Sequence, residues 1–220
     1  MATLLEATHI TKRFPGTTAL DDVHLQLASG EIHAVLGENG AGKSTLMKIL
    51  SGVYVADEGE IRFDGRPVTF SSPHDALRMG IAIVHQELSV IPALTVAENI
   101  YPGRLPTNAL GMVRYNKMFD DARRILRDLQ VDIDPRESLG ALSMASQQLV
   151  EIAKALSLNC RVLILDEPTS ALTEREADVM FSLLRRLAAS GVGILYISHK
   201  LSEVFALADR ITVLRDGKYI

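Results

Sequence analysis

One glycine-rich segment constrains the fold of this chain more than any other feature. Residues 37–45 read GENGAGKST and match the pattern G-x-x-x-x-G-K-[ST]. The segment follows the apolar run IHAVL and precedes LMKIL, so it joins a strand to a helix. Gly37, Gly40 and Gly42 allow a tight turn that points backbone N–H groups at phosphate oxygens, beside the positive end of the helix dipole. The sequence therefore predicts a phosphate-binding loop within an α/β fold.

The residues of this loop have separate expected roles. Lys43 is predicted to reach the β- and γ-phosphates of a nucleotide, and Ser44 is predicted to bind Mg²⁺. The other positions are expected to complete the nucleotide contacts, namely Gly37, Glu38, Asn39, Gly40, Ala41, Gly42 and Thr45.

A second motif, VLILDEPTSALT, supplies two adjacent carboxylates. Asp166 ends the apolar run 162–165, so we expect it at the carboxyl end of a buried strand, where ligands bind in open α/β sheets. This position predicts a second Mg²⁺ ligand. Glu167 follows directly and is suited to activate a water molecule as a general base. The motif therefore favours a nucleotide hydrolase over a kinase.

The order of apolar segments predicts the architecture. Continuous apolar runs alternate with helical periods, as is typical of parallel strands buried on both faces. Shorter alternating segments (LEATHITKRF, DDVHLQLA and GEIRFDGRPVTF) predict an N-terminal antiparallel β layer. We therefore expect an α/β P-loop NTPase core with a mostly parallel sheet, formed by residues 1–86 and 159–220, and an inserted α-helical subdomain at residues 87–158.

Composition excludes several classes of protein. The 220 residues carry a net charge of −4 with scattered Lys and Arg, so we expect no nucleic-acid partner. The single cysteine, Cys160, excludes an internal disulfide and fits a reducing compartment. No apolar run approaches the roughly 18 residues of a membrane helix, so we expect a soluble fragment that meets a membrane through a partner. The abrupt end at VLRDGKYI, where a strand, a turn and a second strand have begun, predicts a piece of a longer chain.

The base of the nucleotide is indicated by a missing motif. Guanine-binding proteins with this loop usually carry Asn-Lys-x-Asp, but here Asn116 and Lys117 are followed by Phe119 at the Asp position. That segment is interpreted as a helix start. Adenine is therefore favoured, and ATP is the expected nucleotide.

With these motifs in this order, the chain resembles the ATP-binding cassette of ABC transporters over essentially its whole length. Phe14 matches the aromatic residue that stacks on adenine in that family. Gln86 matches the glutamine that reaches the metal or the attacking water, and His199 matches the histidine that contacts the γ-phosphate. The resemblance implies a catalytic set of Glu167, His199, Lys43 and Gln86, and a metal site of Ser44, Gln86 and Asp166.

The family's D-loop corresponds to TSALT. Thr173 stands where many members have Asp, and its spacing to Glu176 predicts a capping box at the start of the next helix.

The family's signature, Leu-Ser-Gly-Gly-Gln, corresponds here to LSMAS at residues 142–146. In ABC proteins this helix N-terminus faces the ATP held by another cassette, so Ser143 is implied as a ligand of a partner's nucleotide. Met144 and Ala145 replace two glycines, and Ser146 replaces glutamine. If those positions need positive φ or close backbone approach, each Cβ interferes; if they are helical, the changes cost little.

The helix that follows the signature is predicted from its periodicity. Apolar residues recur at helical spacing and predict one buried face, and polar residues fill the other positions. The apolar set is Leu149, Ile152, Ala153 and Leu156, and the polar set is Gln147, Gln148, Glu151 and Lys154.

Within the family, the chain is most similar to the N-terminal cassette of tandem ATPases that drive bacterial import of ribose, galactose, xylose or arabinose. The resemblance implies two cassettes that close on ATP, supplied by one tandem chain or a homodimer. It also implies permease subunits as partners, a periplasmic sugar-binding protein as an indirect partner, and a peripheral location at the cytoplasmic face of the inner membrane. Residues 87–104 are expected to receive the permease. The alternatives are a non-transport ABC ATPase acting on nucleic acid or ribosomes, and an ATP-dependent kinase.

Overall fold

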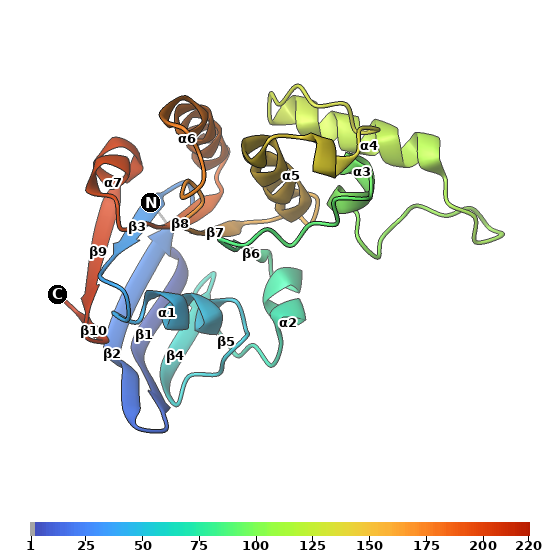
Figure 1. Cartoon of the computed structure of the whole chain (residues 1–220). Helices are drawn as coiled ribbons and strands as arrows, with labels where there is room; N and C mark the ends of the chain where they lie inside the picture. Colours follow the sequence, from blue (N-terminus) through green and yellow to red (C-terminus); the bar gives the residue numbers. More distant parts are fainter. Residues whose placement is uncertain (1–2) are drawn as a thin grey trace.

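The computed structural model describes residues 3–220, which form two β-sheets with helices packed on both sides of the larger one (Figure 1). The smaller sheet is antiparallel, with the order β2-β1-β4-β5. Its strands are β1 (Thr3–Phe14), β2 (Thr17–Ala28), β4 (Glu58–Phe63) and β5 (Arg66–Val68). The antiparallel layer expected from alternating segments is therefore confirmed.

The larger sheet has six strands in the order β10-β9-β3-β8-β7-β6. All neighbours are parallel except β9 and β10, which form an antiparallel hairpin at one edge. The strands are β3 (Ile32–Leu36), β6 (Ile81–Val84), β7 (Val162–Asp166), β8 (Gly193–Ile197), β9 (Arg210–Arg215) and β10 (Lys218–Tyr219). This mostly parallel sheet confirms the predicted fold class.

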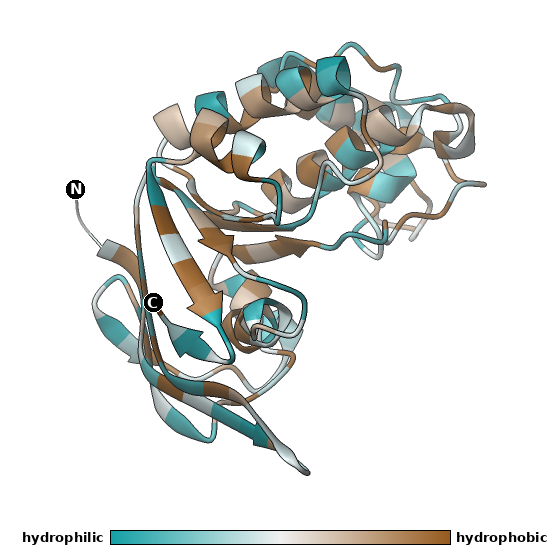
Figure 2. Ribbon diagram, turned by 60° about the vertical axis from the view of Figure 1, so that its left-hand side comes forward, coloured by the Kyte–Doolittle hydropathy of each residue, from teal (hydrophilic) through white to brown (hydrophobic). Residues whose placement is uncertain are grey.

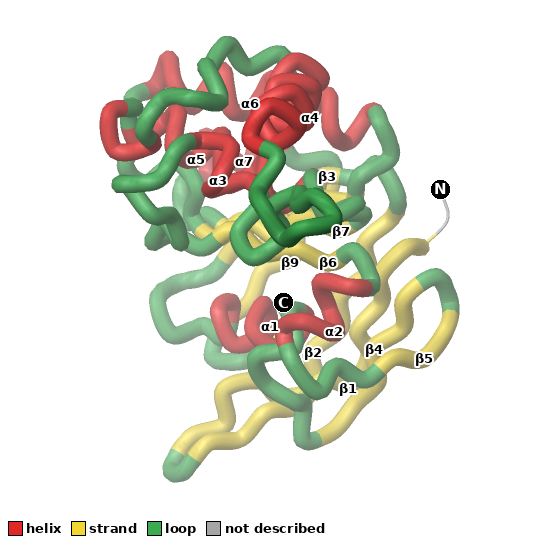
Figure 3. Tube along the Cα trace, turned by 90° about the vertical axis from the view of Figure 1, so that its right-hand side faces the viewer, coloured by secondary structure: helices red, strands yellow, loops and turns green. Residues whose placement is uncertain are grey.

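The helices divide between the two faces of the larger sheet (Figures 1 and 3). One face is covered by α1 and the antiparallel layer, and the opposite face by α5 and α6. The helical segments are α1 (Lys43–Leu50), α2 (Pro73–Arg78), α3 (Val96–Ile100), α4 (Tyr115–Asp128), the 3-10 turn η1 (Leu139–Ala141), α5 (Met144–Leu156), α6 (Glu174–Ala189) and α7 (Leu201–Leu207).

The two faces of the sheet are buried by alternate side chains of the same strand. In β7, Val162 and Ile164 pack toward α1 and the antiparallel layer, whereas Leu163 and Leu165 pack toward α5 and α6. All four are fully buried. Strands of this kind need apolar residues at every position, which explains the continuous apolar runs in the sequence and the hydrophobic centre visible in Figure 2.

Helices α3, α4 and α5 pack against one another and share the core on the α6 side of the sheet. Helix α5 buries more than its apolar stripe, because Gln148 and Glu151 are buried as well. Glu151 bonds to Lys154, whose Nζ also donates to the Ser89 carbonyl at 3.2 Å. The face of α5 that periodicity predicts to be polar and exposed is therefore partly buried. The boundaries of the insert at residues 87 and 158 stay a prediction.

Cys160 lies in the turn that enters β7 and is buried. Its thiol donates to the Val162 carbonyl at 3.1 Å, and burial raises the pKa of the thiol to about 12. Between residues 3 and 220, no helix has the length and apolar character needed to span a lipid bilayer.

Candidate functional site

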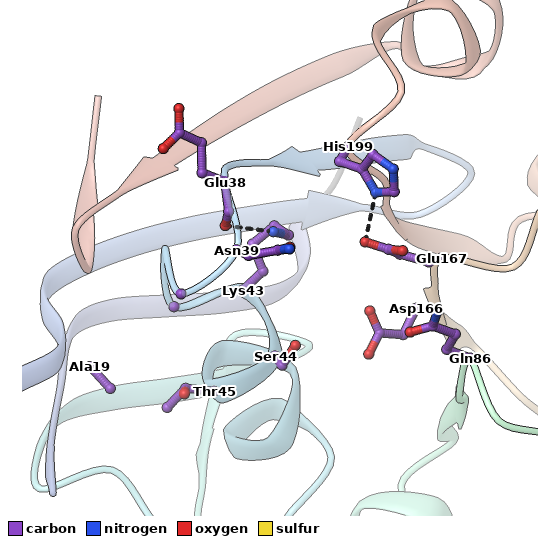
Figure 4. A pocket seen from close by; sticks show the side chains of 12 residues that line it. Ala19, Glu38, Asn39, Lys43, Ser44, Thr45, Gln86, Asp166, Glu167 and His199 are labelled. Atoms are coloured by element: carbon purple, nitrogen blue, oxygen red, sulfur yellow. Dashed lines mark hydrogen bonds and ion pairs between the residues drawn. The ribbon is translucent and has the colours of Figure 1, made fainter. Parts of the chain in front are cut away.

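The loops that leave four strands of the larger sheet meet at its carboxyl edge around one cavity of about 660 Å³ (Figure 4). Parallel strands bring these loops together because their carboxyl ends lie at the same edge. The cavity is lined by Ala19, Glu38, Asn39, Gly40, Gly42, Lys43, Ser44, Thr45, Gln86, Asp166, Glu167 and His199.

The phosphate-loop segment wraps one side of this cavity. Gly40 and Gly42 have φ values of +84° and +102°, and a Cβ on Gly42 would lie 2.6 Å from the Ala19 carbonyl oxygen. Lys43 Nζ donates to the carbonyls of Gly37 at 2.7 Å and Glu38 at 2.9 Å, which holds the ammonium group within the curve of the loop. The loop then runs into α1, whose N-terminal N–H groups face the same space. This geometry suits a polyphosphate.

Asp166 and Glu167 enter the cavity from the opposite side, at the end of β7. Burial, and secondly the charge of Glu167, raise the pKa of Asp166. Glu167 has a φ of +46°, unusual for a residue with a side chain, and its N–H donates to the Ile197 carbonyl at 3.0 Å. This left-handed turn directs its carboxylate toward His199, whose Nδ1 lies 2.9 Å from Glu167 Oε1 (Figure 4). The cavity therefore holds a carboxylate already oriented by an imidazole.

The side chains expected to bind Mg²⁺ fit that ion by their chemistry. Ser44 offers a hydroxyl, Gln86 an amide oxygen and Asp166 a carboxylate, and all three line the same cavity. Mg²⁺ prefers oxygen ligands of this kind and keeps several waters, so a small set of protein oxygens beside a phosphate site is sufficient. Their role as metal ligands remains a prediction.

Phe14 lies at the end of β1 and is not among the residues that line the cavity. Its ring instead packs edge-to-face against Tyr54, with the centroids 5.4 Å apart. Strand β2 instead reaches the cavity through Ala19, a residue that sequence reasoning did not select. Stacking of Phe14 on adenine therefore stays a prediction.

His85 was also missed by sequence reasoning. It precedes Gln86, and its positive charge acts to lower the pKa of Asp166, against the stronger effect of burial. The available signal was its position directly after β6, because residues that follow a parallel strand lie at the carboxyl edge of the sheet.

Ser143 lies outside this cavity, at the N-cap of α5. Its Oγ accepts a hydrogen bond from the Ser146 N–H at 3.2 Å, and it lines a separate hollow of about 290 Å³ between α5 and α6. Met144, Ala145 and Ser146 form the first turn of α5, and none has positive φ. The altered signature is therefore helical and needs no positive φ in this chain, and whether a Cβ obstructs close approach to a partner's nucleotide stays a prediction.

A buried polar network lies directly behind the cavity. Glu203 Oε2 accepts hydrogen bonds from Thr169 Oγ1 at 2.7 Å, Tyr196 Oη at 2.7 Å and Ser198 Oγ at 3.1 Å. Lys200 Nζ lies 3.0 Å from the other carboxylate oxygen. Burial alone would raise the pKa of Glu203, but the hydrogen bonds from Thr169, Tyr196 and Lys200, together with the charge of Lys200, lower this pKa overall. The network ties the loop after Glu167 to the loop that carries His199.

Comparison with known proteins places this geometry in a family. The family model described as "ABC transporter" matches residues 20–170, which include the phosphate loop, Gln86, Asp166 and Glu167. The chain belongs to the ABC transporter family. The cassette is 54% identical over 217 residues to a ribose/galactose/methyl galactoside import ATP-binding protein of Agrobacterium fabrum, with 99% of this chain and 42% of the relative covered. A protein of the same name from Halalkalibacterium halodurans is also 54% identical, at 99% and 42% coverage. The cassette thus spans less than half the length of these curated relatives.

Solved structures agree with the fold. The ADP conformation of an ATP-binding cassette of an ABC transporter superposes with a TM-score of 0.88 at 29% identity, and covers 100% of this chain and 90% of that chain. The dimeric structure of a bacterial ABC transporter cassette gives a TM-score of 0.81 at 25% identity, covering 98% of this chain and 96% of that chain.

Proposed function

We propose that this cassette binds ATP with Mg²⁺, hydrolyses it, and thereby energises sugar import through a membrane permease. The observation that carries the proposal is the Glu167 carboxylate, which points into the cavity opposite the phosphate loop and is held by His199 at 2.9 Å. A positioned carboxylate beside a polyphosphate site is suited to activate water, so hydrolysis is favoured over transfer to another substrate.

In the proposed reaction, Lys43 and the loop N–H groups bind the phosphates, and Mg²⁺ supplies further neutralisation of their charge. Glu167 accepts a proton from a water molecule while the water oxygen attacks the γ-phosphorus. The bond from that phosphorus to the bridging oxygen breaks, and ADP leaves with the electron pair. His199 keeps the Glu167 carboxylate in place and can donate to the γ-phosphate from the same ring. Gln86 would sense the metal from the start of the segment that leads to the insert.

We further propose that the active site is completed by a second cassette. The first turn of α5 offers helix N-terminal N–H groups and the exposed Ser143 hydroxyl, yet these groups lie outside the cavity of their own chain. A neighbouring cassette would place its Ser143 against the γ-phosphate, so each ATP would be sandwiched between two chains or two halves of a tandem chain. The dimeric bacterial cassette with the same fold supports this arrangement.

Sugar import is proposed from the names of the relatives that cover the whole cassette at 54% identity. Permease subunits would dock on residues 87–104, a periplasmic sugar-binding protein would deliver the sugar, and the cassette would lie at the cytoplasmic face of the membrane. Within that segment Glu98 completes the capping box of α3, and Arg104 donates to Ser157 Oγ at 2.8 Å. Docking would therefore use exposed side chains before α3, such as Ile91, which is 53% exposed.

The test of this proposal is light scattering of Glu167→Gln with and without Mg-ATP. Because this variant should bind ATP without hydrolysing it, the proposal expects an ATP-dependent doubling of the mass. Ser143→Arg in the same background should remain monomeric, since a bulky cation would enter the interface.

Three results would count against the proposal. A Glu167→Gln protein that binds ATP but stays monomeric would contradict pairing of this cassette with itself. An ATP-induced dimer that persists with Ser143→Arg would contradict the role of the signature helix. Equal ATPase rates for the wild type and Ser143→Arg would do the same.

A further inference from the structure

Three exposed side chains converge on the outer face of the antiparallel layer, on strands β1 and β2. His9 Nδ1 lies 2.7 Å from Asp22 Oδ1, and His24 Nε2 lies 3.4 Å from the same oxygen. The imidazole rings of His9 and His24 are 4.4 Å apart between centroids and nearly perpendicular. One ligand atom from each residue lies within 4.8 Å of the other two. None of the three lines the nucleotide cavity.

The strand register explains this convergence. Ile10 of β1 pairs with Val23 of β2, and both are completely buried. Since side chains alternate along a strand, Asp22 and His24, which flank Val23, project together to the opposite, solvent-facing side. His9 precedes Ile10 and therefore projects to that same side from the adjacent strand.

The backbone also fixes two of the residues in an unusual conformation. His9 has a φ of +56° and Asp22 a φ of +55°, at a point where the β1–β2 register is interrupted. Gly59 of β4 faces this bulge so closely that a Cβ would lie 2.5 Å from the His9 carbonyl oxygen. The Asp22 N–H donates to Thr11 Oγ1 at 3.2 Å. A bulge held in this way between two neighbouring strands aims its side chains consistently.

Two imidazoles and one carboxylate form a donor set with a clear metal preference. Nitrogen ligands of this kind suit Zn²⁺, Cu²⁺ or Ni²⁺, whereas Mg²⁺ and Ca²⁺ prefer oxygen-only sets. The hydrogen bond from His9 lowers the pKa of Asp22, so this carboxylate is ionised at neutral pH. The charges and hydrogen bonds of both His9 and His24 act to lower this pKa.

We infer that His9, Asp22 and His24 form a binding site for a transition-metal ion of the Zn²⁺ class, separate from the nucleotide cavity. The ion would replace the shared hydrogen bonds with three coordinate bonds and would keep water in its remaining position. Because its ligands come from two paired strands, the bound ion would also fasten β1 to β2.

The experiment is a Zn²⁺ titration of the nucleotide-free protein by isothermal calorimetry in a non-chelating buffer. We expect one saturable site, and a rise in the thermal unfolding midpoint when it fills. His9→Asn, Asp22→Asn and His24→Gln should each weaken binding by about tenfold or more, because even the outer partners of metal ligands change affinity by about 10–100-fold. Asn is chosen at His9 and Asp22 because it tolerates positive φ.

Two controls locate the site. His74→Gln changes an exposed imidazole on α2 and should leave Zn²⁺ affinity unchanged. The double variant His85→Gln with His199→Gln removes the imidazoles beside the nucleotide cavity and should also retain the site. Buried Cys160, whose thiol pKa is raised to about 12, does not compete.

Three outcomes would overturn the inference. These are absence of Zn²⁺ binding by the wild type, unchanged affinity in a folded His24→Gln protein, or loss of binding in the double cavity variant instead. Circular dichroism of each variant distinguishes a lost ligand from a lost fold.

Discussion

Two glutamates beside the larger sheet, Glu167 in the loop after β7 and Glu203 in α7, differ sharply in their surroundings. Glu203 is buried and has bonds to three hydroxyls and to Lys200. Glu167 opens into the cavity, where His199 is its side-chain partner and the carboxylate of Asp166 lies beside it. The carboxylate of Glu203 therefore uses its hydrogen-bonding capacity within the fold. The carboxylate of Glu167 can still accept hydrogen bonds from a ligand.

The difference indicates a structural role for Glu203, which positions the site, and a catalytic role for Glu167. A carboxylate with several donors is a weak base, because each donor stabilises its charged form. Glu167, with one side-chain partner and an open side toward the cavity, can contact a water molecule there. The network around Glu203 spans Thr169 and Ser198, so it fixes the two loops from which Glu167 and His199 project.

The largest expected effect concerns Glu167. Glu167→Gln should reduce phosphate release from ATP by about 10²–10⁴-fold, because the amide accepts no proton from water, while ATP binding persists. Glu38→Gln is the matched control, since Glu38 lines the same cavity and contacts Lys43 through its carbonyl. It should keep the rate within a few-fold. Similar losses in both variants would contradict a special role for Glu167.

The second-largest effect is expected for Glu203, and it concerns stability rather than catalysis. Glu203→Gln should lower the free energy of unfolding by about 1–3 kcal/mol, because buried donors lose a charged acceptor. At temperatures where the variant is folded, it should retain more ATPase activity than Glu167→Gln. Urea unfolding and steady-state rates check this pair of results, with Glu137→Gln as an exposed control. A Glu203→Gln protein with wild-type stability but no ATP hydrolysis would contradict the structural role proposed for Glu203.

The smallest effect should come from Asp166 and should depend on pH. Burial raises the pKa of this carboxyl in the folded state, so its contribution to stability is greatest below its unfolded pKa of about 3.9 and is lost as pH rises through the folded pKa. Nucleotide-free Asp166→Asn should therefore be slightly more stable than the wild type at neutral pH. The difference should shrink toward pH 4, as measured by urea unfolding at both values. A variant that is less stable at neutral pH would contradict this electrostatic account.

Much of the fold could be predicted because its signals are local. The apolar run 162–165 predicted a strand buried on both faces, and the glycines of the phosphate loop predicted a turn between strand and helix. The Thr173–Glu176 capping box was predicted from spacing alone and is present at the start of α6. In each of these cases, neighbouring residues provide the determining interaction.

The features that could not be predicted from the sequence depend on contacts between distant parts of the chain. Glu203 reaches Thr169 from 34 residues away, and neither position has a motif that marks the other. The burial of Gln148 and Glu151 follows from helices packed around α5 rather than from its own periodicity. His9 and Asp22 meet because Ile10 pairs with Val23 beside an interruption of the β1–β2 register, and this pairing between strands is not encoded in either segment alone. Phe14 shows the same limit, because its contact with Tyr54 depends on how the chain after α1 returns to β1.

The buried thiol of Cys160 can report how often the fold opens locally around it. As the chain's sole cysteine, with its pKa raised to about 12, it is almost entirely unreactive toward alkylating reagents while the fold is closed. Modification must therefore wait for the turn before β7 to separate from its surroundings. When reclosing is faster than alkylation, the slowed rate reports the equilibrium population of that open form. One mass-spectrometric time course of alkylation would thus measure the local stability of the strand that carries Asp166, without an engineered cysteine.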